Sequence, residues 1–218
     1  MTIQVSAFRW VPDFAQGFVR DLRVRWALEE AGLPYEAVLI DQDIKATPDY
    51  RAWQPFGQVP AYRDQDVEMF ESGAIVLHLA ARSEALAPRD AAGQARVVTW
   101  VLAALNSVEP VVQQLAELDV FHAGEGWIEE RRPQLEKQVE QRLGQLATWL
   151  GDRDYLEGRF TAGDLMMTTV LRELGDTGLL QRYPTVDALR ERCENRPAFK
   201  RAMEAQLTPF RDNAPVAA

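Results

Sequence analysis

The fold of this chain is decided by the stretch Gly57-Gln-Val-Pro-Ala-Tyr-Arg-Asp-Gln-Asp-Val-Glu-Met-Phe-Glu-Ser72. It combines a proline-bearing bend, two short strand-like runs around a turn, and an acidic-hydroxyl pair before an apolar run. Residues 61–64 and 66–70 are typical of a hairpin. The apolar positions at 74–79 predict a helix with one buried face, and Ser72 is the predicted N-cap of that helix.

The bend is centred on Val59 and Pro60. Proline has no amide hydrogen and fixes its own φ angle, and X-Pro is the bond type at which a cis peptide costs little. A cis bond before an edge strand turns the amide and carbonyl of Val59 away from the sheet. We therefore expect these two groups to pair with the backbone of an extended ligand.

The start of the following helix has the chemistry to hold an amino-acid head group. A helix N-terminus carries unpaired amides and partial positive charge, so a ligand carboxylate is stabilised beside Ser72. The carboxylate of Glu71 can receive the ligand ammonium. Each of these signals also has a purely structural interpretation, as a loop and as a helix cap.

Upstream residues complete an α/β order. Residues 3–8 and 35–40 have strand character, and residues 20–31 are helix formers that end at Gly32, a typical C-cap. With a short helix between residues 45 and 53, the order becomes β-α-β-α-β-β-α. This is the order of a thioredoxin-like domain, with a mixed sheet and helices on both faces.

The second half predicts helices only. Residues 82–92 read as a linker, and residues 95–118 as a helix that Pro110 kinks or divides. An apolar stripe with helical spacing follows at Leu135, Val139, Leu143, Leu146 and Leu150. We therefore expect a thioredoxin-like domain at residues 1–81, a linker at 82–92 and an all-helical domain at 93–218.

Phe160-Thr-Ala-Gly-Asp-Leu165 is the sharpest local signal in the helical half. Thr161 and Asp164 have the spacing of a capping box, and Phe160 and Leu165 stand at the positions of a hydrophobic staple. The motif is interpreted as a folding device and not as a catalytic one.

Two segments of the first half resemble the glutathione-binding domain of cytosolic glutathione S-transferases: Gln54-Pro-Phe-Gly-Gln-Val-Pro60 and Phe70-Glu-Ser-Gly-Ala-Ile75. Gln54 stands where that family more often has asparagine. Asn106-Ser-Val-Glu-Pro110, the capping box and Arg196-Pro-Ala-Phe199 resemble its helical second domain. The resemblance covers nearly the whole chain and implies a homodimer.

The resemblance also implies roles for particular residues. Val59 before a cis Pro60, with Gln58 beside it, would pair with the cysteinyl backbone of glutathione. Glu71 and Ser72 would hold the γ-glutamyl end. Two further residues are implied: Lys45 for the glycyl carboxylate, and Trp100 on a helix that lines the pocket of an electrophilic substrate.

The group that activates the thiol is the open question. Members of the family usually place Tyr, Ser or Cys at the start of the first helix, but residues 10–22 contain none of them. Arg20 can stabilise a thiolate by its charge, Gln16 can donate a hydrogen bond, and the amides around Gly17 can form an anion nest. Arg20 can equally be solvated or paired with Asp21, and Ser6, within a strand, is less well placed.

The implied function is a detoxifying transferase with glutathione as co-substrate, which joins the glutathione thiol to a small electrophilic apolar substrate. Two alternatives stay open. One is a noncatalytic transferase-like module for protein association, because the customary thiol activator is missing. The other is a glutathione-dependent isomerase or reductase.

Composition narrows the classes of partner. The chain has 218 residues and a formal charge of -9, with 7 basic and 12 acidic side chains in residues 1–81 against 17 and 21 in the rest. Neither half is basic, so nucleic acid and anionic membranes are not expected partners. No continuous apolar run of spanning length and no signal segment is apparent, which favours the cytoplasm.

Cysteine and histidine are scarce. Cys193 is the only cysteine, so no internal disulfide and no Cys-x-x-Cys pattern exist. His78 and His122 are the only histidines, and neither has a partner at ligand spacing, so we expect no metal.

Overall fold

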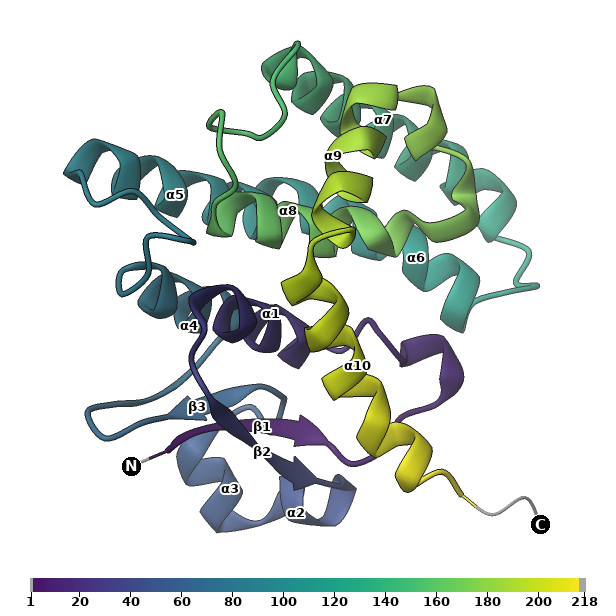
Figure 1. Ribbon diagram of the computed structural model, residues 1–218. Helices are drawn as coiled ribbons and strands as arrows, with labels where there is room; N and C mark the ends of the chain where they lie inside the picture. Colours follow the sequence, from purple (N-terminus) through teal and green to yellow (C-terminus); the bar gives the residue numbers. More distant parts are fainter. Residues whose placement is uncertain (1, 216–218) are drawn as a thin grey trace. The chain divides into compact units, whose positions relative to one another are not determined.

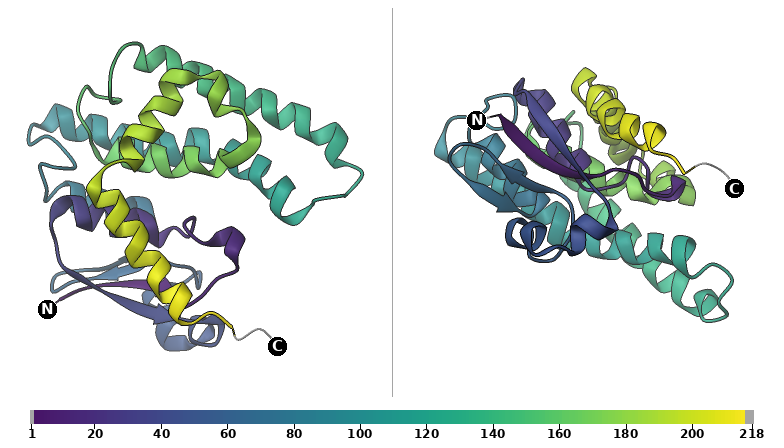
Figure 2. Two further views of the ribbon diagram at one scale, coloured as in Figure 1. Left: turned by 45° about the vertical axis from the view of Figure 1, so that its right-hand side comes forward. Right: turned by 90° about the horizontal axis from the view of Figure 1, so that it is seen from below.

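The computed structural model describes residues 2–215, and contacts divide the chain into two compact units. The first unit joins Met1–Leu86 to Arg196–Ala218, and the second is Ala87–Asn195. This division differs from the expected boundaries at residues 81 and 93. The segment from Arg196 on joins the first unit because helix α10 (Pro197–Asp212) packs along α1 (Asp21–Ala31), which Figures 1 and 2 show side by side.

The first unit is built on a mixed four-stranded sheet. Its order is β2-β1-β3-β4, from β1 (Ile3–Phe8), β2 (Tyr35–Ile40), β3 (Ala61–Arg63) and β4 (Glu68–Phe70). β1 and β2 are parallel, with Val5 opposite Ala37, whereas the other two pairings are antiparallel. Helices α1 and α4 (Ser72–Ala80) cover one face, and α2 (Gln42–Ala46) and α3 (Pro48–Trp53) the other (Figure 1). The predicted thioredoxin-like fold is confirmed.

The helix expected at 45–53 is divided into α2 and α3. Thr47 lies between them with extended backbone, at ψ 149°, because the residue before a proline avoids helical angles. Pro48 occupies the first turn of α3, where no amide donor is needed, and the Thr47 hydroxyl accepts from the Tyr50 amide at 3.2 Å.

The described part of the second unit is helical. Its main helices are α5 (Ala91–Ala103), α6 (Glu109–Phe121), α7 (Ile128–Leu150), α8 (Ala162–Leu171) and α9 (Pro184–Glu194). Three short turns connect them: the π-helical turn η2 (Ala104–Val108) and the 3-10 turns η3 (Arg172–Thr177) and η4 (Leu180–Arg182). The described part of the first unit also contains a 3-10 turn, η1 (Asp13–Ala15). The five apolar residues of the predicted α7 stripe are all buried.

Pro110 divides the predicted helix 95–118, as expected. It lies in the first turn of α6, directly after the π-helical turn η2, because an interior proline removes one helical hydrogen bond and crowds the preceding turn. By length and composition, the helical stretch Ala91–Phe121, which contains α5, η2 and α6, is long and apolar enough to cross a membrane, and 33% of its most apolar part is buried. The sequence analysis did not predict such a stretch, because it found no continuous apolar run of spanning length. Core helices of soluble proteins meet the same criterion.

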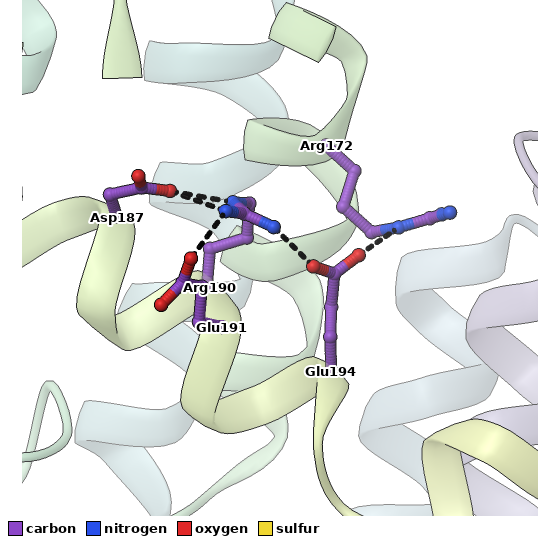
Figure 3. Close-up of polar contacts among 5 residues, drawn as sticks. All are labelled: Arg172, Asp187, Arg190, Glu191 and Glu194. Carbon is purple, nitrogen blue, oxygen red and sulfur yellow. Dashed lines mark hydrogen bonds and ion pairs between the residues drawn. The ribbon is translucent and has the colours of Figure 1, made fainter. Parts of the chain in front are cut away.

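An ion-pair network ties α9 to η3 within the second unit (Figure 3). Arg190 pairs with Asp187 at 2.6 Å and with Glu194, partners three and four residues away on one helix face. The second oxygen of Glu194 accepts from Arg172 at 2.6 Å. Cys193, beside this network, is buried in α9 and agrees with its interpretation as an ordinary helix residue.

The capping box of α8 is present. The Thr161 hydroxyl accepts from the Gly163 amide, and the Asp164 carboxylate accepts from the Thr161 amide at 2.8 Å and from the Leu156 amide at 2.8 Å. Burial raises the pKa of Asp164 to about 6, although these hydrogen bonds favour the ionised form.

This raised pKa predicts a pH dependence of stability. Between pH 4 and 6 the folded protein keeps the Asp164 proton that the unfolded chain, with its ordinary pKa of 3.8, releases. The free energy of unfolding therefore falls as pH rises through this window, by about 2–3 kcal/mol. Asp164→Asn removes this component. Urea unfolding of both proteins from pH 4 to 7 measures it, and parallel stability curves would contradict the assignment.

Candidate functional site

The bend at Val59 presents the backbone groups that the sequence predicts. The Val59-Pro60 peptide bond is cis, and β3 begins directly after it at Ala61. Within residues 2–215, the amide and carbonyl of Val59 make no hydrogen bond to the protein. The described part of the protein therefore leaves the hydrogen-bonding capacity of both groups unused.

A buried hydrogen-bond chain holds the residues on either side of the bend. The Tyr50 hydroxyl donates to the Gln58 carbonyl at 2.6 Å and accepts from the Ser6 hydroxyl at 2.8 Å. The Ser6 oxygen in turn accepts from the Ala61 amide at 2.7 Å. Burial raises the pKa of Tyr50, so the phenol stays protonated and donates at neutral pH. In this chain the Ser6 hydroxyl both donates, to Tyr50, and accepts, from the Ala61 amide.

One core cluster lies beneath several predicted site segments. Its buried members are Ile40, Tyr50, Trp53, Val59 and Ala61, and Phe8, Val19, Val38 and Ile44 pack against it. Arg20 and Lys45 directly follow Val19 and Ile44, so each is next in sequence to a residue that packs on the cluster containing Val59. Lys45 is half-buried, with its ammonium 5.8 Å from the centre of the Phe8 ring.

The start of α4 differs from the prediction by one residue. Glu71, and not Ser72, is the N-cap, because the Glu71 carbonyl already accepts from the Ile75 amide at 3.0 Å. Glu71 is exposed and has φ 70° and ψ 112°, a backbone conformation that side chains rarely adopt. Ser72 is buried as the first residue of the helix.

Arg23 is a further candidate site residue, which the sequence analysis missed. It is 3% exposed on α1, and its guanidinium donates to the Ser72 hydroxyl oxygen at 3.4 Å. Because a guanidinium only donates, the Ser72 hydrogen remains available to a ligand carboxylate. The signal in the sequence was an arginine on the apolar side of the predicted helix, since arginine is rarely buried without a partner or a role.

The turn that leads into α1 contains the predicted activating groups. Arg20 is the half-buried N-cap of α1, and Gly17 has φ 81°. The Gln16 side-chain amide donates to the Val11 carbonyl at 3.2 Å and to Asp13 at 3.1 Å. Gln16 would have to exchange one of these partners to donate to a thiolate.

Trp100 belongs to the second unit. It is half-buried on α5, its indole donates to Glu157 at 2.8 Å, and its ring lies 5.2 Å from that of Trp149. Its contact with an electrophile stays a prediction. Residues 2–215 contain no group of three or more His, Cys, Asp or Glu side chains placed to hold a metal.

Comparison with known proteins identifies the family. The model of the glutathione S-transferase N-terminal domain matches residues 22–87. Glutathione S-transferase 4 of Zea mays is 30% identical over 208 residues, which span 88% of this chain and 90% of that protein. A glutathione S-transferase of Hyoscyamus muticus is 29% identical over 198 residues, 84% of this chain and 92% of the relative.

Solved structures agree. A glutathione transferase family member of Pseudomonas fluorescens, with two glutathione bound, has a TM-score of 0.80 at 26% identity and covers 93% of this chain and 92% of its own. A glutathione transferase of Burkholderia graminis, with two glutathione molecules bound per subunit, has a TM-score of 0.78 at 26% identity, with 94% and 88% covered. Sequence and fold together show that the chain belongs to the glutathione S-transferase family of enzymes.

Proposed function

We propose that this enzyme binds glutathione extended along the bend at Val59 and transfers its thiol to an electrophilic apolar substrate. The observation that carries the proposal is the unpaired backbone of Val59, held in place by hydrogen bonds to Gln58 and Ala61 on either side. Calorimetric titration of the protein with glutathione tests the proposal. Absence of saturable binding would overturn both the site and the activity.

The binding mode assigns protein groups to the backbone and to each charged part of glutathione. The cysteinyl backbone pairs with Val59, next to Pro60 and the exposed Gln58. The γ-glutamyl carboxylate lies at the start of α4, where the Ser72 hydroxyl donates to it and Arg23 supplies positive charge behind it. Glu71 receives the ammonium, and Lys45 receives the glycyl carboxylate.

The chemistry requires a thiolate. The glutathione thiol releases its proton to solvent, and the sulfur electron pair then forms the new bond to the electrophilic carbon. In displacement, a leaving group departs with its bonding electrons; in addition, the π bond of the substrate breaks and its electrons take up a proton from solvent. A nearby positive charge lowers the thiol pKa and raises the thiolate fraction at neutral pH. We assign this role to Arg20, with Gln16 as a further donor.

Arg20→Met is expected to raise the pKa of bound glutathione by about one unit or more, because it removes that positive charge. Gln16→Ala should have a smaller effect, since the Gln16 hydrogens are already engaged with Val11 and Asp13. Thiolate absorbance against pH, at saturating glutathione, measures both. Arg201→Met is the control, because it removes an exposed arginine of the same unit that pairs with Glu29. An equal shift in all three variants would exclude a specific role for Arg20.

A glutathione-dependent disulfide reductase is the second candidate, favoured by the two glutathione molecules bound to each of two solved relatives. In that reaction one glutathione thiolate attacks a substrate disulfide and releases a thiol, and the second glutathione attacks the mixed disulfide to give glutathione disulfide. Two observations would favour the reductase over transfer to an electrophile. They are binding of two glutathione molecules per chain and formation of glutathione disulfide as a substrate disulfide is reduced to thiols.

We also propose a cytoplasmic homodimer. Large apolar side chains are exposed on α5, at Val98 (41%) and Leu102 (45%), and on the loop before the bend, at Phe56 (63%). A second copy that covers them would remove this apolar surface from water. Light scattering should give about twice the 24.7 kDa mass of one chain, and Leu102→Glu should halve it. Val120→Glu, at a residue 44% exposed on α6, is the control, and a monomeric wild type would contradict the proposal.

A further inference from the structure

Three buried polar side chains join α10 to the start of α1. Asp21 and Gln206 are fully buried, and Arg25 is 2% exposed. Arg25 donates to Asp21 at 2.6 Å, and the side-chain amide of Gln206 donates to the other Asp21 oxygen at 2.5 Å. Burial raises the pKa of Asp21, although its pairing with Arg25 opposes this effect.

Gln206 holds both neighbours of Arg20. Its amide nitrogen donates to the Val19 carbonyl at 3.0 Å as well as to Asp21. Both side-chain hydrogens are therefore used on residues 19 and 21, between which lies the predicted thiol-activating arginine. Val19 in turn packs on the core cluster that contains Val59. The backbone of Arg20 is thus tied to the same cluster as the proposed cysteinyl-binding bend.

The rest of α10 fixes where Gln206 can reach. At the other end of the helix pair, Arg196 donates to both oxygens of Glu30, at 2.6 and 2.7 Å, and the ring of Phe199 lies 4.8 Å from that of Trp26. Near Gln206, Arg25 donates to the Ala205 carbonyl at 3.1 Å. Gln206 therefore stands on a helix anchored along its length to α1.

Stability alone does not explain this polar arrangement. Within the described residues, the side-chain oxygen of Gln206 is buried without a hydrogen-bond partner. Buried polar groups without partners are unfavourable, and apolar side chains of similar volume often replace buried ion pairs without loss of stability. The amide cannot be reversed, because its oxygen would then face the Val19 carbonyl and the Asp21 carboxylate, which are both acceptors.

We propose that Gln206 is a positioning residue for thiol activation: the C-terminal helix uses it to hold the turn 19–21, so that Arg20 is aimed at the glutathione sulfur. The inference rests on the proposed function. It assigns to the last helix of the chain a part in the chemistry of the first domain. A small displacement of a catalytic group costs much of its effect, so loss of this hydrogen-bond pair should reduce activation more than binding.

The test compares Gln206→Met with Arg196→Gln. Met fills a similar volume without donors, and Arg196→Gln weakens the same helix pair at its other end. Gln206→Met is expected to raise the pKa of bound glutathione by about one unit and to lower kcat at neutral pH about tenfold, with glutathione affinity changed less than about threefold. Arg196→Gln should lower the thermal midpoint without changing the thiol pKa.

The outcomes separate the two proposals. A wild type that binds no glutathione overturns the proposed function, and this inference with it. If the wild type forms thiolate, two results overturn the role of Gln206 alone. One is an unchanged pKa of bound glutathione in Gln206→Met, and the other is an equal shift of that pKa in Arg196→Gln. Combination of Gln206→Met with Arg20→Met supplies the last check: the double variant should shift the thiol pKa no more than Arg20→Met does, and additive shifts would contradict action through Arg20.

Discussion

Replacement of Glu71 by glycine is expected to stabilise the folded protein by about 1 kcal/mol while it weakens glutathione binding at least tenfold. Glu71 has φ 70°, where a side chain strains the backbone and glycine does not. Part of the gain is offset, since glycine loses more conformational freedom on folding. Binding weakens because the carboxylate that receives the ligand ammonium is removed. Urea unfolding and calorimetric titration measure the two effects.

Glu71→Gln separates strain from charge. It keeps the side chain, and therefore the strained backbone, but removes the negative charge. We expect its free energy of unfolding to equal that of the wild type and its glutathione affinity to fall as in the glycine variant. A less stable Glu71→Gly protein would show that the conformation is not strained, and wild-type affinity in both variants would remove Glu71 from the site.

Tyr50→Phe is expected to weaken glutathione binding about tenfold and to lower the free energy of unfolding by about 1–3 kcal/mol. The variant leaves the Gln58 carbonyl without its 2.6 Å donor and the Ser6 hydroxyl without an acceptor. The bend that presents Val59 is then held from the Ala61 side only. Affinity falls because the backbone groups of Val59 must be ordered when the ligand binds.

A double-mutant cycle with Ser6→Ala tests whether the two hydroxyls act together. Because the two hydroxyls belong to one hydrogen-bond chain, the double variant should lose less affinity than the sum of the losses in the two single variants. Tyr155→Phe, in the second unit, is the matched control and should bind glutathione as the wild type does. Additive losses would show that Ser6 and Tyr50 support the bend independently.

The absence of Tyr, Ser and Cys from residues 10–22 defines what is unusual in this family member. The structure adds a physical context to that absence. The turn before α1 has an arginine at the N-cap, a glutamine engaged within its own loop, and an anchor from Gln206. The proposed activation by the charge of Arg20 depends on this arrangement.

Local features were predictable because neighbouring residues cause them. The order of strands and helices, the bend at Pro60, the break at Pro110 and the capping box at Thr161 all follow from backbone restrictions or from the period of apolar residues. Errors at this level were small. Thr47 divided a helix that was expected to be continuous, and the N-cap of α4 fell on Glu71 instead of Ser72.

By itself, then, the sequence determined the first domain's fold, the helical character of the second and the segment that presents Val59. Only the tertiary structure decided that α10 belongs with the first unit, that Arg23 reaches Ser72, and that Gln206 holds the turn around Arg20. The physical reason is separation along the chain: Arg23 and Ser72 are 49 positions apart in the sequence, and Gln206 and Asp21 are 185 positions apart. Propensity and periodicity report a residue's own backbone and the face it buries, whereas a partner that far away is chosen only when whole elements pack.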